Sequence, residues 1–90
     1  MDKAIITVVG KDTTGILAKT CTYLADAGIN ILDITQSVVQ GYFNMMMIVD
    51  LGPAGKRFDS VATGIAELGR TMGLKIGCQK AEIFERMHRV

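Results

Sequence analysis

The residues with the clearest chemical potential lie in one short segment, K-D-T-T-G-I. It offers a carboxylate, two hydroxyls and, if a helix starts there, backbone N–H groups without intrahelical partners. Such N–H groups suit an anionic group, while Asp12 together with Asn30 can hold an ammonium group. The segment therefore predicts a site for a small zwitterion, provided that Asn30 lies near the mouth of the turn. The candidate ligand-binding residues are Lys11, Asp12, Thr13, Thr14, Gly15, Ile16 and Asn30. The alternative is a plain strand-to-helix connection, for which the local sequence suffices.

Catalytic and metal chemistry find little support in the sequence. The one histidine, His88, has no base partner nearby, and no Ser/His/Asp set can be assembled. Gly10 and Gly15 are not followed by the Lys and Ser/Thr of a phosphate-binding loop. Cys21 and Cys78 form no C-x-x-C pair, and we interpret them as buried small hydrophobes in a reducing compartment. We expect no enzyme, no cofactor and no metal.

Composition limits the class of partner. The chain has 90 residues, of which 49% are hydrophobic, and a net charge of +1. This length predicts a single domain over residues 1–90, and it favours oligomers because so short a chain buries only roughly 60–65% of its unfolded surface. The charge argues against a nucleic-acid partner, and no apolar run approaches the ~18–20 residues that span a bilayer. We expect a globular domain of the cytoplasm, with no membrane partner.

Three elements must position the turn. Residues 3–9 form a β-branched run that predicts a strand. Asp12, Thr13 or Thr14 can cap the helix that follows, and Gly28 fits the left-handed position that ends helices. The apolar stripe of this helix is expected at Ile16, Leu17, Cys21, Leu24, Ala25 and Gly28. Residues 29–39 alternate between apolar and polar, which indicates a strand with one wet face or an edge position.

The second half repeats the pattern. Gln40 and Gly41 predict a two-residue hairpin into a third strand over 42–51. A break at 52–55 precedes a helix over about 56–72 and a strand over 74–81. A short helix packed on the sheet is predicted for 82–90, with a continued strand as the alternative. With right-handed crossovers, this order predicts an α+β, ferredoxin-like βαββαβ sandwich, in which two helices cover one face of a four-stranded antiparallel sheet.

The other face of that sheet is expected to stay open. Met45, Met46 and Met47 are consecutive, so at least one methionine lies on each face. Exposed apolar surface of this kind marks an interface. Self-association and internal cover by the terminal segment with Phe84 and Met87 are weighed equally. We also expect the second strand at a sheet edge, where it can join a copy of itself in a homodimer.

The segments D-T-T-G-I-L and L-A-D-A-G-I-N-I resemble the ACT domain, whose signature is D/N-x-x-G-[IVL]-L followed by G-x-N-I. The chain is also similar to small free-standing single-ACT proteins and to the ACT repeats of the glycine-cleavage regulator. The resemblance implies a regulatory module that binds an amino acid, usually between paired domains. It implies ligand contacts from Asp12, the backbone of residues 13–16, and Asn30. Gly10 stands where some amino-acid-binding members have a histidine. The alternative function is a ligand-free module of the same fold that binds a protein partner.

Overall fold

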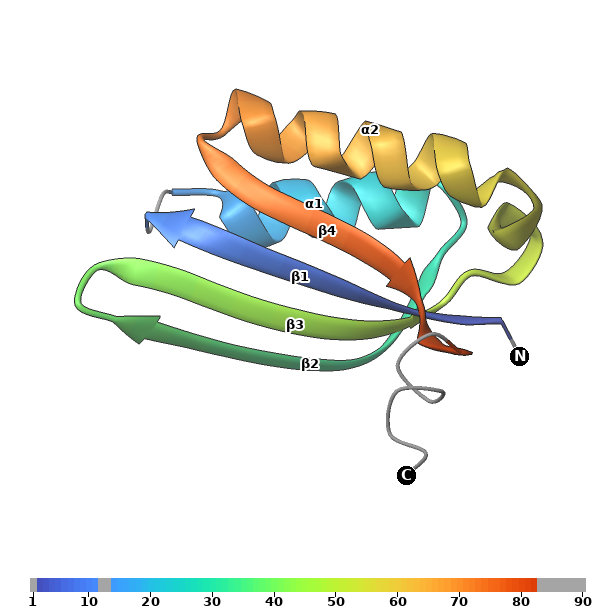
Figure 1. Ribbon diagram of the computed structural model, residues 1–90, viewed down its shortest axis with the longest axis horizontal. Helices are drawn as coiled ribbons and strands as arrows, with labels where there is room; N and C mark the ends of the chain where they lie inside the picture. The colour runs from blue at the N-terminus through green and yellow to red at the C-terminus, as the bar shows by residue number, and fades with distance from the viewer. Residues whose placement is uncertain (1, 12–13, 83–90) are drawn as a thin grey trace.

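The computed structural model describes residues 2–11 and 14–82, which form a four-stranded sheet and a helical layer (Figure 1). The elements are β1 (Lys3–Lys11), α1 (Ile16–Asp26), β2 (Asn30–Val39), β3 (Tyr42–Asp50), the 3₁₀ helix η1 (Gly52–Arg57), α2 (Phe58–Thr71) and β4 (Leu74–Lys80). The predicted ferredoxin-like βαββαβ order is confirmed. The helix predicted for the tail falls, beyond Glu82, outside the described residues.

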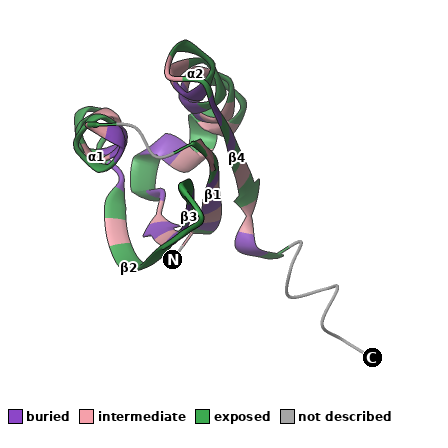
Figure 2. Cartoon of the chain, turned by 90° about the vertical axis from the view of Figure 1, so that its left-hand side faces the viewer, coloured by how far each residue is buried: buried purple, intermediate pink, exposed green. Residues whose placement is uncertain are grey.

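The strands lie in the order β2-β3-β1-β4, and every neighbouring pair is antiparallel. β1 and β3 are therefore central, and β2 occupies an edge as predicted. Both helices lie on one face of the sheet, with α1 on the β2 side and α2 against β4 (Figure 2). The hairpin between β2 and β3 turns at Gln40 and Gly41, whose φ values of 52° and 81° are those of the predicted two-residue turn.

The core lies between the helices and the two central strands. Every second residue of β1 and β3 is buried, because successive side chains of a strand point to opposite faces. Met45 and Met47 are 4% and 0% exposed, whereas Met46 is 50% exposed on the open face. The predicted division of the methionines between the two faces is thus confirmed. The helices contribute the buried residues Ile16, Thr20, Leu24, Val61, Ile65 and Gly69.

The start of α1 differs from the prediction. Its N-cap is Gly15, with a left-handed φ of 86°, and not Asp12, Thr13 or Thr14. Glycine adopts this conformation without the steric strain that a Cβ would bring. No side chain therefore caps the helix from its N-cap position, and its first backbone donors are left for other partners.

The buried face of α1 is also rotated relative to the prediction. Thr20 is fully buried, whereas Leu17 is 40% exposed and Ala25 is exposed. The Thr20 hydroxyl donates a hydrogen bond of 2.7 Å to the carbonyl oxygen of Ile16, so its burial leaves no unpaired polar atom. A polar residue with a satisfied hydroxyl thus takes a core position that simple hydropathy assigns to its neighbours.

The end of α1 is as predicted. Gly28 has a φ of 77°, its N–H donates to the carbonyl of Ala25, and the N–H of Ile29 donates to the carbonyl of Leu24. This pair of bonds is the Schellman arrangement, which stops a helix and redirects the chain. Ile29 and Leu24 are both buried, so the same turn adds to the core and directs the chain into β2.

The segment between β3 and α2 is more regular than predicted. Residues 52–57 form η1 instead of a break, and α2 starts at Phe58. Pro53 lies in the first turn of η1, where its missing N–H removes no helical hydrogen bond. Leu51 and Ala54 are 0% and 1% exposed, and the N–H of Ala54 donates to the carbonyl of Leu51. Burial of these two residues holds the segment against the core.

Candidate functional site

The predicted turn is shorter than the sequence suggested. β1 continues past the predicted residues 3–9, with Gly10 paired to Phe43 and Lys11 paired to Tyr42. Lys11 is therefore a strand residue at the end of the sheet. Asp12 and Thr13 fall outside the described residues. The segment resumes with Thr14, which is exposed, and Gly15.

The start of α1 presents backbone donors at this end of the sheet. The N–H of Lys19 donates to the carbonyl of Gly15 at 2.9 Å, which is the first hydrogen bond of the helix. The N–H groups that precede it have no intrahelical acceptor. Ile16 is only 3% exposed, so it supplies its backbone to the site while its side chain packs in the core. Backbone N–H groups of this kind are suited to an anionic group such as a carboxylate.

Asn30 lies at the opposite end of the sheet. It pairs with Asp50, which also pairs with Lys3, whereas Lys11 pairs with Tyr42. β1 spans 9 residues between these two levels, which corresponds to about 26 Å of strand. The predicted meeting of Asn30 with the turn therefore does not occur within one chain. The reason is that α1 runs back along the sheet before β2 begins (Figure 1).

β2 is the least covered strand, because only Ile31 is even half-buried. Ile34 and Val38 are 40% and 55% exposed on the face that carries the helices, and Val39 is 57% exposed on the open face. Leu17 of α1 adds a further exposed apolar side chain. The edge position of β2 was predicted, whereas the exposure of its apolar residues on both faces was not. The sequence carried a signal for this exposure, because apolar residues occur at both odd and even positions of the strand and therefore point to both faces.

Gly10 has a packing role. An added Cβ would lie 2.6 Å from Leu74 Cδ2 and 3.2 Å from Leu74 Cα, on the neighbouring strand. Such distances are too short for unstrained contact, so no side chain fits without movement of β4. Leu74 therefore occupies the space that a histidine side chain at this position would need.

The two cysteines are less buried than predicted. Cys21 and Cys78 are both half-buried free thiols, and burial raises the pKa of the Cys78 thiol. Among the described residues, no group of three or more His, Cys, Asp or Glu side chains could hold a metal ion. Within residues 2–11 and 14–82, no helix has the length and apolar character needed to cross a membrane.

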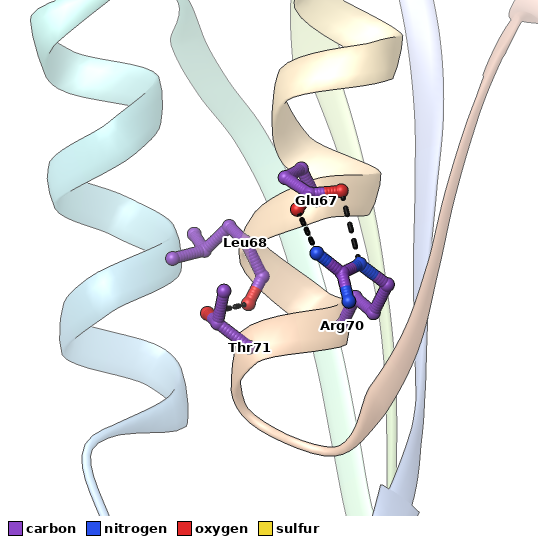
Figure 3. Close-up of polar contacts among 4 residues, drawn as sticks. All are labelled: Glu67, Leu68, Arg70 and Thr71. Carbon is purple, nitrogen blue, oxygen red and sulfur yellow. Dashed lines mark hydrogen bonds and ion pairs between the residues drawn. The ribbon is translucent and has the colours of Figure 1, made fainter.

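The last turns of α2 carry polar contacts that lie within the helix itself (Figure 3). Arg70 forms an ion pair with Glu67, which lowers the pKa of Glu67 and raises the pKa of Arg70. The hydroxyl of Thr71 donates to the carbonyl of Leu68 at 2.7 Å. Both charged side chains are largely exposed, so solvent screens their attraction. These contacts complete the last turns of the helix, and none involves a predicted site residue.

Comparison with known proteins agrees with this architecture. Residues 2–79 match the family model of the ACT domain. A UPF0237 protein of Bifidobacterium longum is 53% identical over 90 residues, and one of Methanococcus maripaludis is 38% identical over 90 residues; each match covers 100% of both chains.

Solved structures show the same likeness. An ACT domain protein from Streptococcus pneumoniae superposes with a TM-score of 0.78 at 41% identity, covering 93% of this chain and 94% of that chain. A structure described as a candidate glycine cleavage system transcriptional repressor has a TM-score of 0.78 at 25% identity, covering 88% of this chain and 45% of that one. The chain belongs to the ACT domain family.

Proposed function

We propose that the protein is a non-enzymatic, cytoplasmic regulatory module that binds a small amino acid between two copies of the chain. ACT domains are regulatory modules that bind small ligands, which supports the class of function. The proposed contacts are Lys11, Asp12, Thr13, Thr14, Gly15 and Ile16 from one chain and Asn30 from the other.

The uncovered edge of β2 is the observation that carries this proposal. If two β2 strands pair antiparallel about a two-fold axis through their middle, Asn30 of one copy lies level with Val39 of the other. Val39 pairs with Tyr42, and Tyr42 pairs with Lys11. Edge pairing therefore brings Asn30 of the second copy to the end of the sheet where α1 starts. The candidate residues, separated by the length of the sheet in one chain, then lie at the same end of the paired sheets.

The same pairing covers the apolar residues that β2 exposes. The α1 helix lies on the β2 side of the sheet, so two α1 helices become neighbours above the paired strands. Leu17, Ile34 and Val38, each at least 40% exposed in the single chain, then face the second copy. Removal of this apolar area from water favours the dimer.

The chemistry of the proposed site follows from its donors and acceptors. Backbone N–H groups at the start of α1 hold the carboxylate of the ligand, and Asp12 with the partner copy's Asn30 holds its ammonium group. A ligand that contacts both chains stabilises one dimer arrangement over others, and this shift of population is the regulatory signal.

Calorimetric titration of the full chain with a panel of amino acids tests the proposal. We expect heat with at least one of them and at least tenfold weaker binding by Asn30→Ala. Asn44→Ala, which removes an exposed amide from the open face of β3, is the matched control and should bind normally. No heat and no thermal shift with any amino acid would refute the proposal.

A mixing experiment tests the shared site directly. Asn30→Ala chains keep the turn, and Asp12→Ala chains keep Asn30. In a mixed dimer, one of the two shared sites has both intact parts, so mixing should restore binding to a fraction of the sites. A site built within one chain would be defective in both halves of the mixed dimer. Absence of any recovery, with mixed dimers present, therefore contradicts the arrangement.

A ligand-free interaction module is the second candidate, and the open face of the sheet favours it. Val9 and Met46 are 48% and 50% exposed there. This function predicts a stable dimer, no heat with any amino acid, and a protein partner recovered in pull-down experiments.

A further inference from the structure

The face of the sheet opposite the helices stays uncovered even when two β2 edges pair. Every second residue of the central strands points to it, including Ile5, Thr7 and Val9 on β1. Met46 and Ile48 of β3 lie beside them. The centre of this open face is thus apolar, with two large side chains about half exposed. A surface of this composition is typical of an interface.

A hollow of ≈ 270 Å³ lies on this face beside Met46. It owes its depth to short polar side chains on three neighbouring strands, namely Thr7, Thr35, Ser37 and Asn44. Met46 rises next to it and is half exposed. Methionine is unbranched and flexible, so it can fill an irregular gap of this kind. One face therefore carries both a projecting side chain and a recess that could receive it.

The charges of the open face are divided between opposite corners. Lys11 and Lys75 lie at the end where β1 finishes and β4 begins. Asp33 and Asp50 lie toward the other end, on β2 and β3, with Lys3 paired beside Asp50. The face is thus basic at one corner and more acidic at the diagonally opposite corner. A surface with both signs at opposite corners can pair with a reversed copy of itself.

We propose that this open face docks against the same face of a second copy. The two copies are related by a two-fold axis that lies between the two sheets and runs across the line joining the basic and acidic corners. That axis places the basic corner of each copy over the acidic corner of the other. Near the centre, it brings Met46 of each copy to the hollow of the other. The result has the apolar centre and charged rim of a specific interface. Combined with pairing of β2 edges, it gives each chain a second, separate interface with another copy.

The same observations disfavour a nucleic acid on this face. Its charges nearly cancel, whereas binding to phosphates requires a basic surface. Single-stranded RNA is held on sheets of this fold by aromatic side chains of the central strands. Among the described residues of β1 and β3 that point to this face, only Tyr42 is aromatic, and it lies at the end of its strand.

Cross-linking tests the contact at the centre. In a Cys21→Ser/Cys78→Ala background, Met46→Cys should give a covalent dimer with a short bismaleimide, because the two residues approach across the axis. Lys19→Cys, an exposed position on α1, is the control and should stay uncross-linked. If Met46→Cys cross-links no better than Lys19→Cys, the docking is refuted.

Sedimentation of the full chain separates the two interfaces. Ile34→Lys should disrupt the β2 edge alone, whereas Met46→Lys or Lys75→Glu should weaken face docking at least tenfold and leave the edge dimer intact. The double variant Lys75→Glu/Asp33→Lys exchanges the corner charges and should restore docking. Masses unchanged by Met46→Lys would overturn the proposal in favour of another occupant, such as residues 83–90. The edge dimer of the proposed function would still be judged by Ile34→Lys.

Discussion

Replacing Gly10 with alanine tests the packing between β1 and β4 at the position where some ACT domains have a histidine. The new Cβ would lie 2.6 Å from Leu74 Cδ2, 3.2 Å from Leu74 Cα and 3.3 Å from the carbonyl oxygen of Gly73. The Leu74 side chain can rotate away, but the other two atoms belong to the backbone. Because Gly10 and Leu74 are directly paired, the two strands must separate locally.

Two opposing effects determine the size of the change. Forcing an extra methyl group into a packed site costs about 1–3 kcal/mol. Alanine also restricts the unfolded chain, which returns about 0.4–1 kcal/mol. We therefore expect Gly10→Ala to lower the free energy of unfolding by about 1–2 kcal/mol, a sizeable part of the total of roughly 5–15 kcal/mol for a small domain.

Urea unfolding followed by circular dichroism, at one fixed protein concentration, measures this difference. Gly77→Ala is the matched control, since Gly77 lies on the same strand pair but its added Cβ meets only Thr7 Oγ1, at 3.3 Å. That variant should be about as stable as the parent or slightly more stable. In a Leu74→Ala background the Gly10→Ala penalty should shrink. A Gly10→Ala protein with the parental midpoint, or one more stable than Gly77→Ala, would show that the close packing argument is wrong.

Two further predictions follow from burial. Met47→Ala should lower the free energy of unfolding by about 2–5 kcal/mol, because the Met47 side chain is 0% exposed. Met46→Ala in dilute protein should change this free energy little, because Met46 is 50% exposed. Equal losses of stability in urea titrations would contradict the assigned faces. Burial raises the pKa of Cys78 in the folded state, so stability is full below the unfolded pKa and falls as pH rises through the folded pKa. Cys78→Ala should remove this decline, which begins near the ordinary thiol pKa of about 8.5, and an identical decline in the variant would exclude Cys78 as its cause.

The fold was predictable because strong local signals agree with the pattern of apolar residues. Gly28 sits where only a left-handed residue ends the helix and turns the chain, and Gln40 with Gly41 fixes the hairpin register. The exceptions depend on atoms that hydropathy does not describe. Thr20 is buried because its hydroxyl reaches the carbonyl of Ile16, a contact that exists only once the helix has formed.

The candidate site was predictable only in part. The segment around Gly15 was identified by its residue types, and the structure confirms that α1 starts beside it. The position of Asn30 could not be inferred from its spacing along the chain. It depends on the length of α1 and on the strand order, which inserts β3 between β2 and β1. Residue types along the chain therefore indicate the candidate residues, and the topology separates Asn30 from the turn within one chain.

The central position of β1 has a consequence for how the domain is made. Ala4 pairs with Lys80 and Gly10 pairs with Leu74, so the first strand of this domain to be synthesised cannot complete its pairing until the last strand of the sheet is available. Pairing between β2 and β3 joins residues that are close in the sequence and can form early, whereas pairing of β4 with β1 is a long-range event. Until β4 pairs with β1, the apolar residues of β1 and its unpaired edge can associate with other chains. We expect this domain to complete its fold only after the residues through Lys80 have been released.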